Sequence, residues 1–275
     1  MIRLLDLFSG IGGFSLGLER SGFFRTVALC EINPFRRRVL AKHWPGVPCY
    51  GDVTTLTGRR LAADGITVDA ICGGFPCQDV SAAGSGAGIT GSRSGLWSEY
   101  ARLIGELRPG VVLVENVALL RSRGLDRVLG DLAALGYDAE WDCVPASAVG
   151  ARHRRDRLWI VAYADGRGSH EKSVGLGWGR GPADADRDGA IRHVADPVGA
   201  GLSLPERGPV FGTWWRSQGR AVAERGGWAA EPELGRVAHG VPNRVDRLRS
   251  LGDSLVPQIP EMIGLAIGAA MEAAP

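Results

Sequence analysis

The stretch Val68-Asp69-Ala70-Ile71-Cys72-Gly73-Gly74-Phe75-Pro76-Cys77-Gln78 decides how the rest of the chain is interpreted. It begins as a short apolar run typical of a buried parallel strand, and two glycines end that run. In an open α/β sheet, ligands bind where such strands end at their carboxyl side. We therefore expect Cys77 to lie in a loop at the edge of a cleft, as a candidate nucleophile. A buried structural cysteine is the alternative, because free cysteine is among the most buried residue types.

Length and composition favour a globular protein. The 275 residues are 45% hydrophobic, enough for one large domain with a small appendage. No apolar run reaches the roughly 18–20 residues of a membrane helix, and the N-terminal residues do not resemble a signal peptide. The five cysteines have no C-x-x-C spacing, so we expect neither a disulfide framework nor a metal site. These features predict a reduced, cytoplasmic protein without membrane contact.

A glycine-rich turn follows the first predicted strand. Residues 3–8, Arg-Leu-Leu-Asp-Leu-Phe, are the predicted strand, residues 9–13 read Ser-Gly-Ile-Gly-Gly, and residues 14–19 have helical spacing. This order is typical of nucleoside-binding units, because glycines let backbone N–H groups approach a ligand near a helix N-terminus. A simple tight turn is the alternative.

Three acids follow predicted strands in the same way. Glu31 follows the strand 26–30 and is placed to bind a ribose diol, or else to act as a helix N-terminal charge. Asp52 follows the strand 47–50 and could accept from an adenine amino group, or form an Asx turn. Glu115 follows the buried strand 111–114, at the same sheet edge as Cys77. A functional role is favoured there, with a helix cap as the alternative.

The net charge of +2 does not indicate a nucleic-acid partner, but arginines crowd into residues 152–157. This segment runs into an apolar strand, so part of it must lie near the sheet. Strands at 137–145 and 158–163 are expected to form an antiparallel pair at one end of that sheet. Helices are predicted at 35–43, 95–107, 125–135 and 259–274, the last packing on the first domain.

The chain divides by composition into three parts. Residues 1–164 form the predicted catalytic and cofactor-binding domain, and residues 241–275 return to it. Residues 165–240 show no sustained period and predict a small irregular region, or a partly disordered insert. The Gly- and Ser-rich residues 79–94 predict a functional or disordered loop.

Together these patterns resemble the C5-cytosine-specific DNA methyltransferase family. The resemblance covers about residues 1–163 and 244–270, in the family's usual order. The matching pieces are Asp6-Leu7-Phe8-Ser9-Gly10-Ile11-Gly12-Gly13, Glu31, Gly51-Asp52-Val53, Gly74-Phe75-Pro76-Cys77-Gln78, Glu115-Asn116-Val117, the arginine segment and Leu251-Gly252-Asp253-Ser254-Leu255-Val256-Pro257.

The resemblance implies an α/β fold with a Rossmann-like, mostly parallel sheet and helices on both faces, as in S-adenosylmethionine-dependent methyltransferases. Residues 165–240 would be the target-recognition region. The implied cofactor is S-adenosyl-L-methionine. Its implied binding residues are Phe8, Gly10, Ile11, Gly13, Glu31, Ile32, Asp52, Val53, Pro76, Leu96, Asp253 and Ser254.

The resemblance also implies the reaction. Cys77 would add to C6 of a flipped-out cytosine in duplex DNA, and Glu115 would hydrogen-bond or protonate N3. For this Glu115 needs a raised pKa, which a dry cleft favours. Arg155 and Arg157 would hold the flipped nucleotide and Glu115. The implied DNA-binding residues are Gln78, Ser81 and Arg155.

Two positions depart from the family pattern, namely His153, where Gln is usual, and Asp253, where Asn is usual. An RNA or tRNA cytosine-5 methyltransferase and a catalytically idle DNA-binding protein of the same fold remain the alternatives. We expect a monomer of prokaryotic or phage origin. A cognate restriction endonuclease that acts separately is left open.

Overall fold

The computed structural model describes residues 1–76, 95–164, 222 and 242–272. Cys77, Gln78 and Ser81 lie outside the described residues, as does the predicted recognition region apart from Val222. The predictions for those residues therefore stay predictions.

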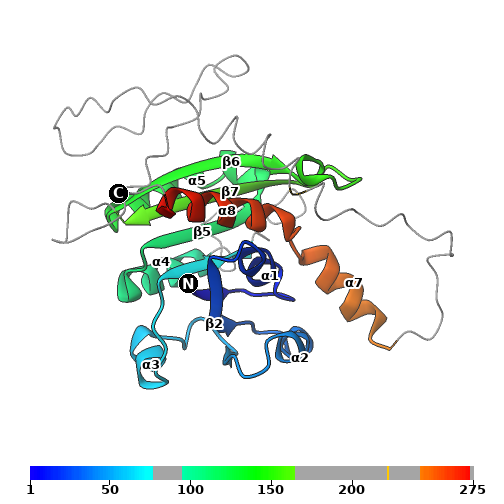
Figure 1. The fold of residues 1–275 in the computed structure, drawn as a ribbon, viewed down its shortest axis with the longest axis horizontal. Helices are drawn as coiled ribbons and strands as arrows, with labels where there is room; N and C mark the ends of the chain where they lie inside the picture. The colour runs from blue at the N-terminus through cyan, green and yellow to red at the C-terminus, as the bar shows by residue number, and fades with distance from the viewer. Residues whose placement is uncertain (77–94, 165–221, 223–241, 273–275) are drawn as a thin grey trace, which may run out of the picture.

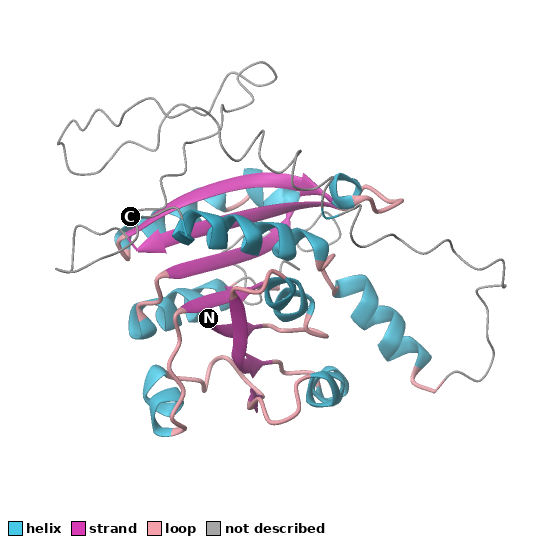
Figure 2. Ribbon diagram, in the orientation of Figure 1, coloured by secondary structure: helices cyan, strands magenta, loops and turns pink. Residues whose placement is uncertain are grey.

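A single seven-stranded sheet runs through the described residues in the order β3-β2-β1-β4-β5-β7-β6 (Figures 1 and 2). Neighbouring strands from β3 to β5 are parallel, whereas β7 is antiparallel to both β5 and β6. The mostly parallel sheet and its antiparallel pair at one end are confirmed. The strands are β1 (Ile2–Leu7), β2 (Phe24–Cys30), β3 (Cys49–Tyr50), β4 (Ala70–Gly73), β5 (Val111–Val117), β6 (Tyr137–Pro145) and β7 (Asp156–Ala164).

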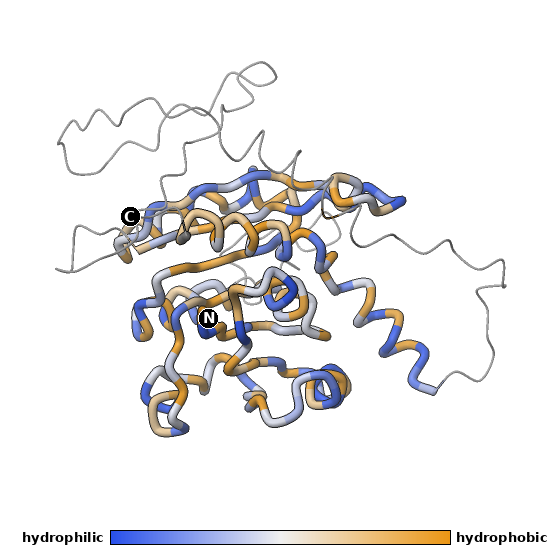
Figure 3. Tube along the Cα trace, viewed as in Figure 1, coloured by the Kyte–Doolittle hydropathy of each residue, from blue (hydrophilic) through white to orange (hydrophobic). Residues whose placement is uncertain are grey.

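Helices cover both faces of the sheet because its central strands are apolar on both sides (Figure 3). Leu5 and Ile71 point to the face covered by α4 and α5, and their neighbours Leu4 and Cys72 point to the face covered by α1 and α8. The helices are α1 (Gly13–Arg20), α2 (Pro34–His43), α3 (Gly58–Ala63), α4 (Leu96–Leu107), α5 (Leu125–Ala134), α7 (Arg244–Asp253) and α8 (Gln258–Glu272), with 3-10 turns η2 (Ala118–Ser122) and η3 (Ala146–Val149).

The C-terminal helix α8 packs on α1, as predicted (Figure 1). The approach is close, since a Cβ on Gly17 would lie 2.2 Å from the carbonyl oxygen of Pro257. Within the described residues, the helical stretch Arg244–Met271 is long and apolar enough to cross a membrane by length and composition. The length and composition are weak evidence for a membrane span, because the buried Met262 and Ile263 place the apolar side of α8 in the core.

Several elements differ from the sequence predictions. Helix α3, capped by the Thr57 hydroxyl, and helix α7 were not predicted. The third strand has two residues, Cys49–Tyr50, instead of four. Strand β5 continues through Glu115 to Val117, so Glu115 lies within the ladder rather than after it.

Candidate active site

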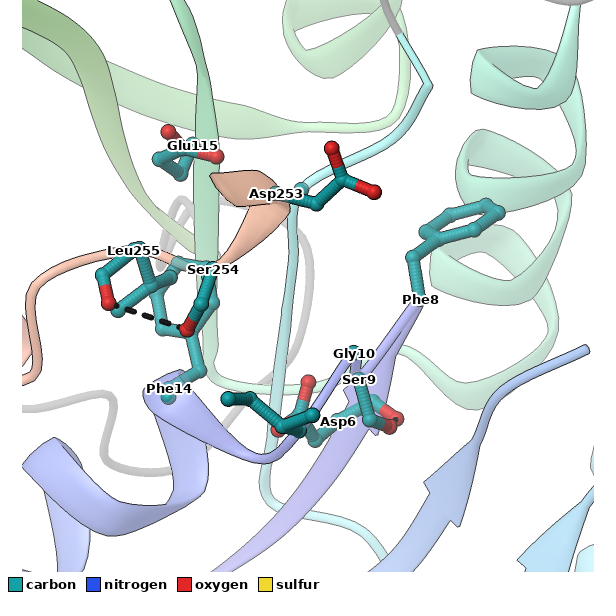
Figure 4. Close-up of a pocket in the computed structure, with 12 residues that line it drawn as sticks. Asp6, Phe8, Ser9, Gly10, Phe14, Glu115, Asp253, Ser254 and Leu255 are labelled. Carbon is teal, nitrogen blue, oxygen red and sulfur yellow. Dashed lines mark hydrogen bonds between the residues drawn. The ribbon is translucent and has the colours of Figure 1, made fainter. Parts of the chain in front are cut away.

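A pocket lies at the carboxyl edge of the sheet, where β1 and β4 end side by side (Figure 4). The chain proceeds from β1 to β2 and β3 on one side and then crosses to β4 on the other, so this is the topological switch point. The pocket encloses about 350 Å³, including space open to solvent. It is lined by Asp6, Phe8, Ser9, Gly10, Ile11, Gly13, Phe14, Gly74, Glu115, Asp253, Ser254 and Leu255.

The glycine-rich turn forms the floor of this pocket. Gly10 and Gly12 have φ angles of 58° and 86°, which L side chains rarely adopt. A Cβ on Gly13 would lie 3.0 Å from the Leu255 side chain and 3.2 Å from the Ser254 hydroxyl. The turn therefore needs its glycines both for its backbone path and for the close approach of the C-terminal segment.

Glu31 ties this turn to the start of α2. Its carboxylate accepts hydrogen bonds from the N–H groups of Gly10 and Asn33, each at 2.8 Å, and the residue is 4% exposed. Asn33 in turn caps α2 by accepting from the N–H groups of Phe35 and Arg36. Glu31 thus fixes the rim beside the turn, and its role toward a ribose stays a prediction.

Five predicted cofactor residues besides Glu31 lie outside the pocket lining. Asp52 forms the Asx turn given as its alternative, because Oδ1 accepts from the N–H of Thr54 at 2.9 Å and from its hydroxyl at 2.8 Å. Ile32 is 72% exposed, whereas Val53 is buried in the core. The remaining two, Pro76 and Leu96, are half-buried.

Asp6 is a pocket residue whose side chain the sequence reasoning did not single out. It is 1% exposed, and Oδ2 accepts from the hydroxyl of Ser15 at 2.7 Å. Oδ1 is also buried and has no hydrogen-bond partner among the described residues. Burial raises the pKa of Asp6 to about 7, although the bonds from Ser15 and the interaction with the Cys72 thiol lower it. An acid inside the apolar strand Ile2–Leu7 was the signal that could have identified it.

Glu115 reaches the pocket from β5 and forms an ion pair with Arg157 of β7, with 3.0 Å between Oε1 and Nε. Burial raises the pKa of Glu115 to about 7, and the nearby Arg157 and Arg155 lower it less than burial raises it. The prediction of a raised pKa is confirmed. A Cβ on Gly74 would lie 2.7 Å from Oε2, so the glycine leaves room for this carboxyl.

Arg155 makes a contact that the resemblance did not imply, and its implied contact with a flipped nucleotide stays a prediction. Its guanidinium donates to the carbonyl oxygens of Gly252 at 2.7 Å and Ser254 at 2.6 Å. Arg157 therefore holds the Glu115 carboxyl directly, while Arg155 holds the C-terminal segment that lines the pocket.

The two departures from the family pattern have different surroundings. His153 is exposed. Asp253 lines the pocket and forms an ion pair with Arg36 of α2, a contact that sequence reasoning missed. Arg36 lies on the predicted helix 35–43, and the sequence gives no signal that links it to Asp253.

A mostly parallel seven-stranded sheet with one reversed strand, and with a glycine-turn pocket at its switch point, defines the α/β fold of S-adenosylmethionine-dependent methyltransferases. Within that class, the chain belongs to the C-5 cytosine-specific DNA methylase family, whose profile matches residues 2–176.

Among its relatives is the Type II methyltransferase M2.BsuMI of Bacillus subtilis, 32% identical over 238 residues, which are 84% of this chain and 54% of the relative. Another is the Type II methyltransferase M.CviJI of Paramecium bursaria Chlorella virus IL3A, 35% identical over 58% of this chain and 42% of the relative. The chain thus spans about half the length of the curated relatives it matches.

Solved structures show the same fold. A putative DNA modification methyltransferase encoded within a prophage of E. coli is 28% identical, with a TM-score of 0.51 over 60% of this chain and 47% of that one. Spodoptera frugiperda DNMT2 has the same TM-score of 0.51 at 22% identity, over 62% of this chain and 53% of that one. The second likeness concerns the fold alone.

Proposed function

We propose that this chain is a DNA (cytosine-5-)-methyltransferase that uses S-adenosylmethionine as methyl donor. The observation that carries the proposal is the Glu115 carboxyl, held by Arg157 on the wall of the glycine-turn pocket. A carboxyl with a pKa of about 7 is partly protonated near neutral pH and can donate to a ring nitrogen. Membership of the cytosine-5 family makes N3 of cytosine the natural acceptor.

The residues of the pocket fit S-adenosylmethionine, which supplies an electrophilic methyl group on a cationic sulfur. The buried Oδ1 of Asp6 has no partner among the described residues and suits a cationic ligand. Asp253 adds negative charge and Ser254 adds a hydroxyl on the opposite side of the pocket (Figure 4). The proposed role of Glu31 is to bind the ribose hydroxyls, and that of Phe8 is to shape the pocket.

On the target side, we assign the nucleophile to Cys77. Its thiolate would add to C6 of a cytosine flipped out of duplex DNA, while Glu115 protonates or hydrogen-bonds N3. Arg157 keeps the Glu115 carboxyl in place, and Gln78 and Ser81 would contact the DNA. Residues 165–240 would read a short target sequence by contacts to base edges. The likeness to Type II methyltransferases supports a role in restriction–modification.

The test compares two half-buried glutamates. Burial raises the pKa of both Glu115 and Glu140 to about 7, but Glu140 lies on the edge strand β6 and outside the pocket lining. Transfer of tritiated methyl groups to duplex DNA should fall at least ~100-fold in Glu115→Gln, as expected for loss of a general acid. It should change less than about twofold in Glu140→Gln. Cys77→Ser should abolish transfer and keep cofactor binding.

The contrary outcomes are distinct. Wild-type transfer rates in Glu115→Gln or Cys77→Ser would refute the assigned chemistry. Transfer to tRNA but not to duplex DNA would favour the RNA methyltransferase alternative. If the wild-type protein binds DNA and transfers nothing, the idle DNA-binding alternative holds. Mapping methylcytosine at base resolution after expression in an unmethylated host would then identify the target sequence.

A further inference from the structure

The Arg36–Asp253 ion pair joins two sides of the pocket. Asp253 ends α7 and lines the pocket, and Arg36 lies in α2, 217 positions earlier in the chain. In Figure 4 the Asp253 carboxylate points away from Glu115, toward the side of the pocket where Phe8 lies. The pair therefore lies at the cofactor side of the site rather than at the Glu115 wall.

The Arg36 end of this pair is firmly placed. The Arg36 side chain is 16% exposed, against 57% for Asp253. The backbone N–H of Arg36 donates to the Asn33 side chain at 3.2 Å, and the Asn33 N–H donates to the Glu31 carboxylate at 2.8 Å. Glu31 also accepts from the N–H of Gly10 at 2.8 Å. Arg36 is thus connected through a short series of hydrogen bonds to the glycine turn that forms the pocket floor.

The Asp253 end has little other support within its helix. In the part of the chain that the structure describes, Ser250 is the one buried residue of α7. The apolar residues Val245, Leu248 and Leu251 are 72%, 59% and 64% exposed. Figure 1 shows α7 extending away from the sheet. Contacts at the C-terminal end of α7, together with the packing of α8 on α1, therefore determine where residues 253–255 lie.

Two guanidinium groups make those contacts. Arg155 holds the backbone on one side, through the carbonyl oxygens of Gly252 and Ser254 at 2.7 and 2.6 Å. Arg36 holds the Asp253 side chain on the other. Because charge-assisted hydrogen bonds are stronger than neutral ones, the two arginines together can fix a segment that its own helix does not anchor.

We propose that Arg36 is a positioning residue of the methyl-donor pocket, which acts through Asp253 to hold residues 253–255 over the glycine turn and so slows release of the donor. This inference rests on the proposed function. Arg36 does not line the pocket, so its effect on the donor must pass through Asp253.

The test measures binding and dissociation of S-adenosylmethionine in Arg36→Gln, Asp253→Asn and the double variant of the full chain. Each single variant should release the donor roughly three- to tenfold faster, and the double variant no faster than Asp253→Asn, because the effect of Arg36 passes through Asp253. Higher ionic strength should speed release from the wild type and leave the variants almost unchanged. Arg36→Lys should restore part of the wild-type behaviour.

Arg38→Gln, on the exposed side of the same helix, is the matched control and should release the donor at the wild-type rate. In Arg36→Gln the KM for the donor should rise, with kcat changed less than about twofold. Wild-type release rates in the single variants, or additive effects in the double variant, would overturn the inference. If the wild-type protein binds no S-adenosylmethionine at all, the proposed function fails. If the wild type binds the donor and the variants release it at the wild-type rate, the inference about Arg36 alone fails.

Discussion

Two carboxyl groups that line the pocket, Asp6 and Glu115, both have a pKa that removal from water raises to about 7. A carboxyl with a raised pKa keeps its proton in the folded state at pH values where the unfolded chain has lost it. The folded state therefore binds more protons between about pH 4 and pH 7, and its stability falls as the pH rises through that range.

Replacing Asp6 by Asn should remove part of this pH dependence. Between pH 5 and pH 8 the wild type should lose at least ~1.4 kcal/mol more unfolding free energy than Asp6→Asn, the equivalent of one pKa unit. Urea denaturation at the two pH values measures the difference. Asp126→Asn, which changes an exposed carboxylate of α5, should follow the wild-type dependence. If the unfolding free energy of Asp6→Asn changed with pH as much as that of the wild type, the raised pKa of Asp6 would be contradicted.

Gly74 should be needed because of the space that it leaves for Glu115. In Gly74→Ala the added Cβ would lie 2.7 Å from Oε2, so the carboxyl must move. We expect methyl transfer to fall ~100-fold, since small displacements of catalytic groups have effects of this order.

The control for that variant is Gly110→Ala, where the nearest atom would be the Asp69 carbonyl oxygen at an ordinary 3.7 Å. It should retain wild-type transfer of tritiated methyl groups. Full activity in Gly74→Ala would show that the position of the Glu115 carboxyl is not critical.

At the scale of elements, the contact between α1 and α8 places the C-terminal segment beside the glycine turn. A Cβ on Gly17 would lie 2.2 Å from the Pro257 carbonyl oxygen and 2.6 Å from the Pro260 ring. Leu255 and Ser254, which precede α8, then come close to Gly13. The close packing of two helices thus brings a distant part of the chain to the pocket.

Gly17→Ala should therefore destabilise the protein by about 1–3 kcal/mol, as expected for overpacking. Its matched control is Gly130→Ala in α5, where a Cβ would meet nothing within 4 Å. There, alanine should stabilise the helix by about 0.5–1 kcal/mol. Urea denaturation of the two variants measures both effects. An unchanged unfolding free energy in Gly17→Ala would mean that α8 shifts readily on α1.

At the scale of the whole molecule, the pocket is assembled from parts far apart in the chain, namely the turn after β1, the ends of β4 and β5, and the end of α7. A ligand bound there contacts the folded state and has no such site in the unfolded chain. Ligand binding should consequently be visible as global stabilisation.

S-adenosylmethionine at 100 times its dissociation constant should add about 2.7 kcal/mol to the unfolding free energy. Thermal unfolding at increasing donor concentration measures the shift. ATP shares the adenosine part but carries several negative charges, which the carboxyls of Asp6 and Glu115 in the pocket lining would repel, so it should give no shift. Equal stabilisation by both ligands would contradict a pocket built for a cation.

Local patterns in the chain were sufficient to predict where most of the apolar strands lie, and hence Glu115 and the glycine turn near one edge of the sheet, although β5 continues past Glu115 and β3 is shorter than predicted. They succeed because apolar runs and the turn residues that follow them are properties of neighbouring residues. They were not sufficient for helix α7, whose period is weak and which buries only Ser250 among the described residues.

Tertiary structure alone decided which charged groups meet. Arg157 pairs with Glu115 because β7 lies beside β5. Arg155 binds the segment that ends α7, and Arg36 meets Asp253 across 217 positions. The pKa of Asp6 is raised to about 7 because the folded core removes the carboxyl from water. Each of these results depends on distances and burial that exist only when remote segments pack together.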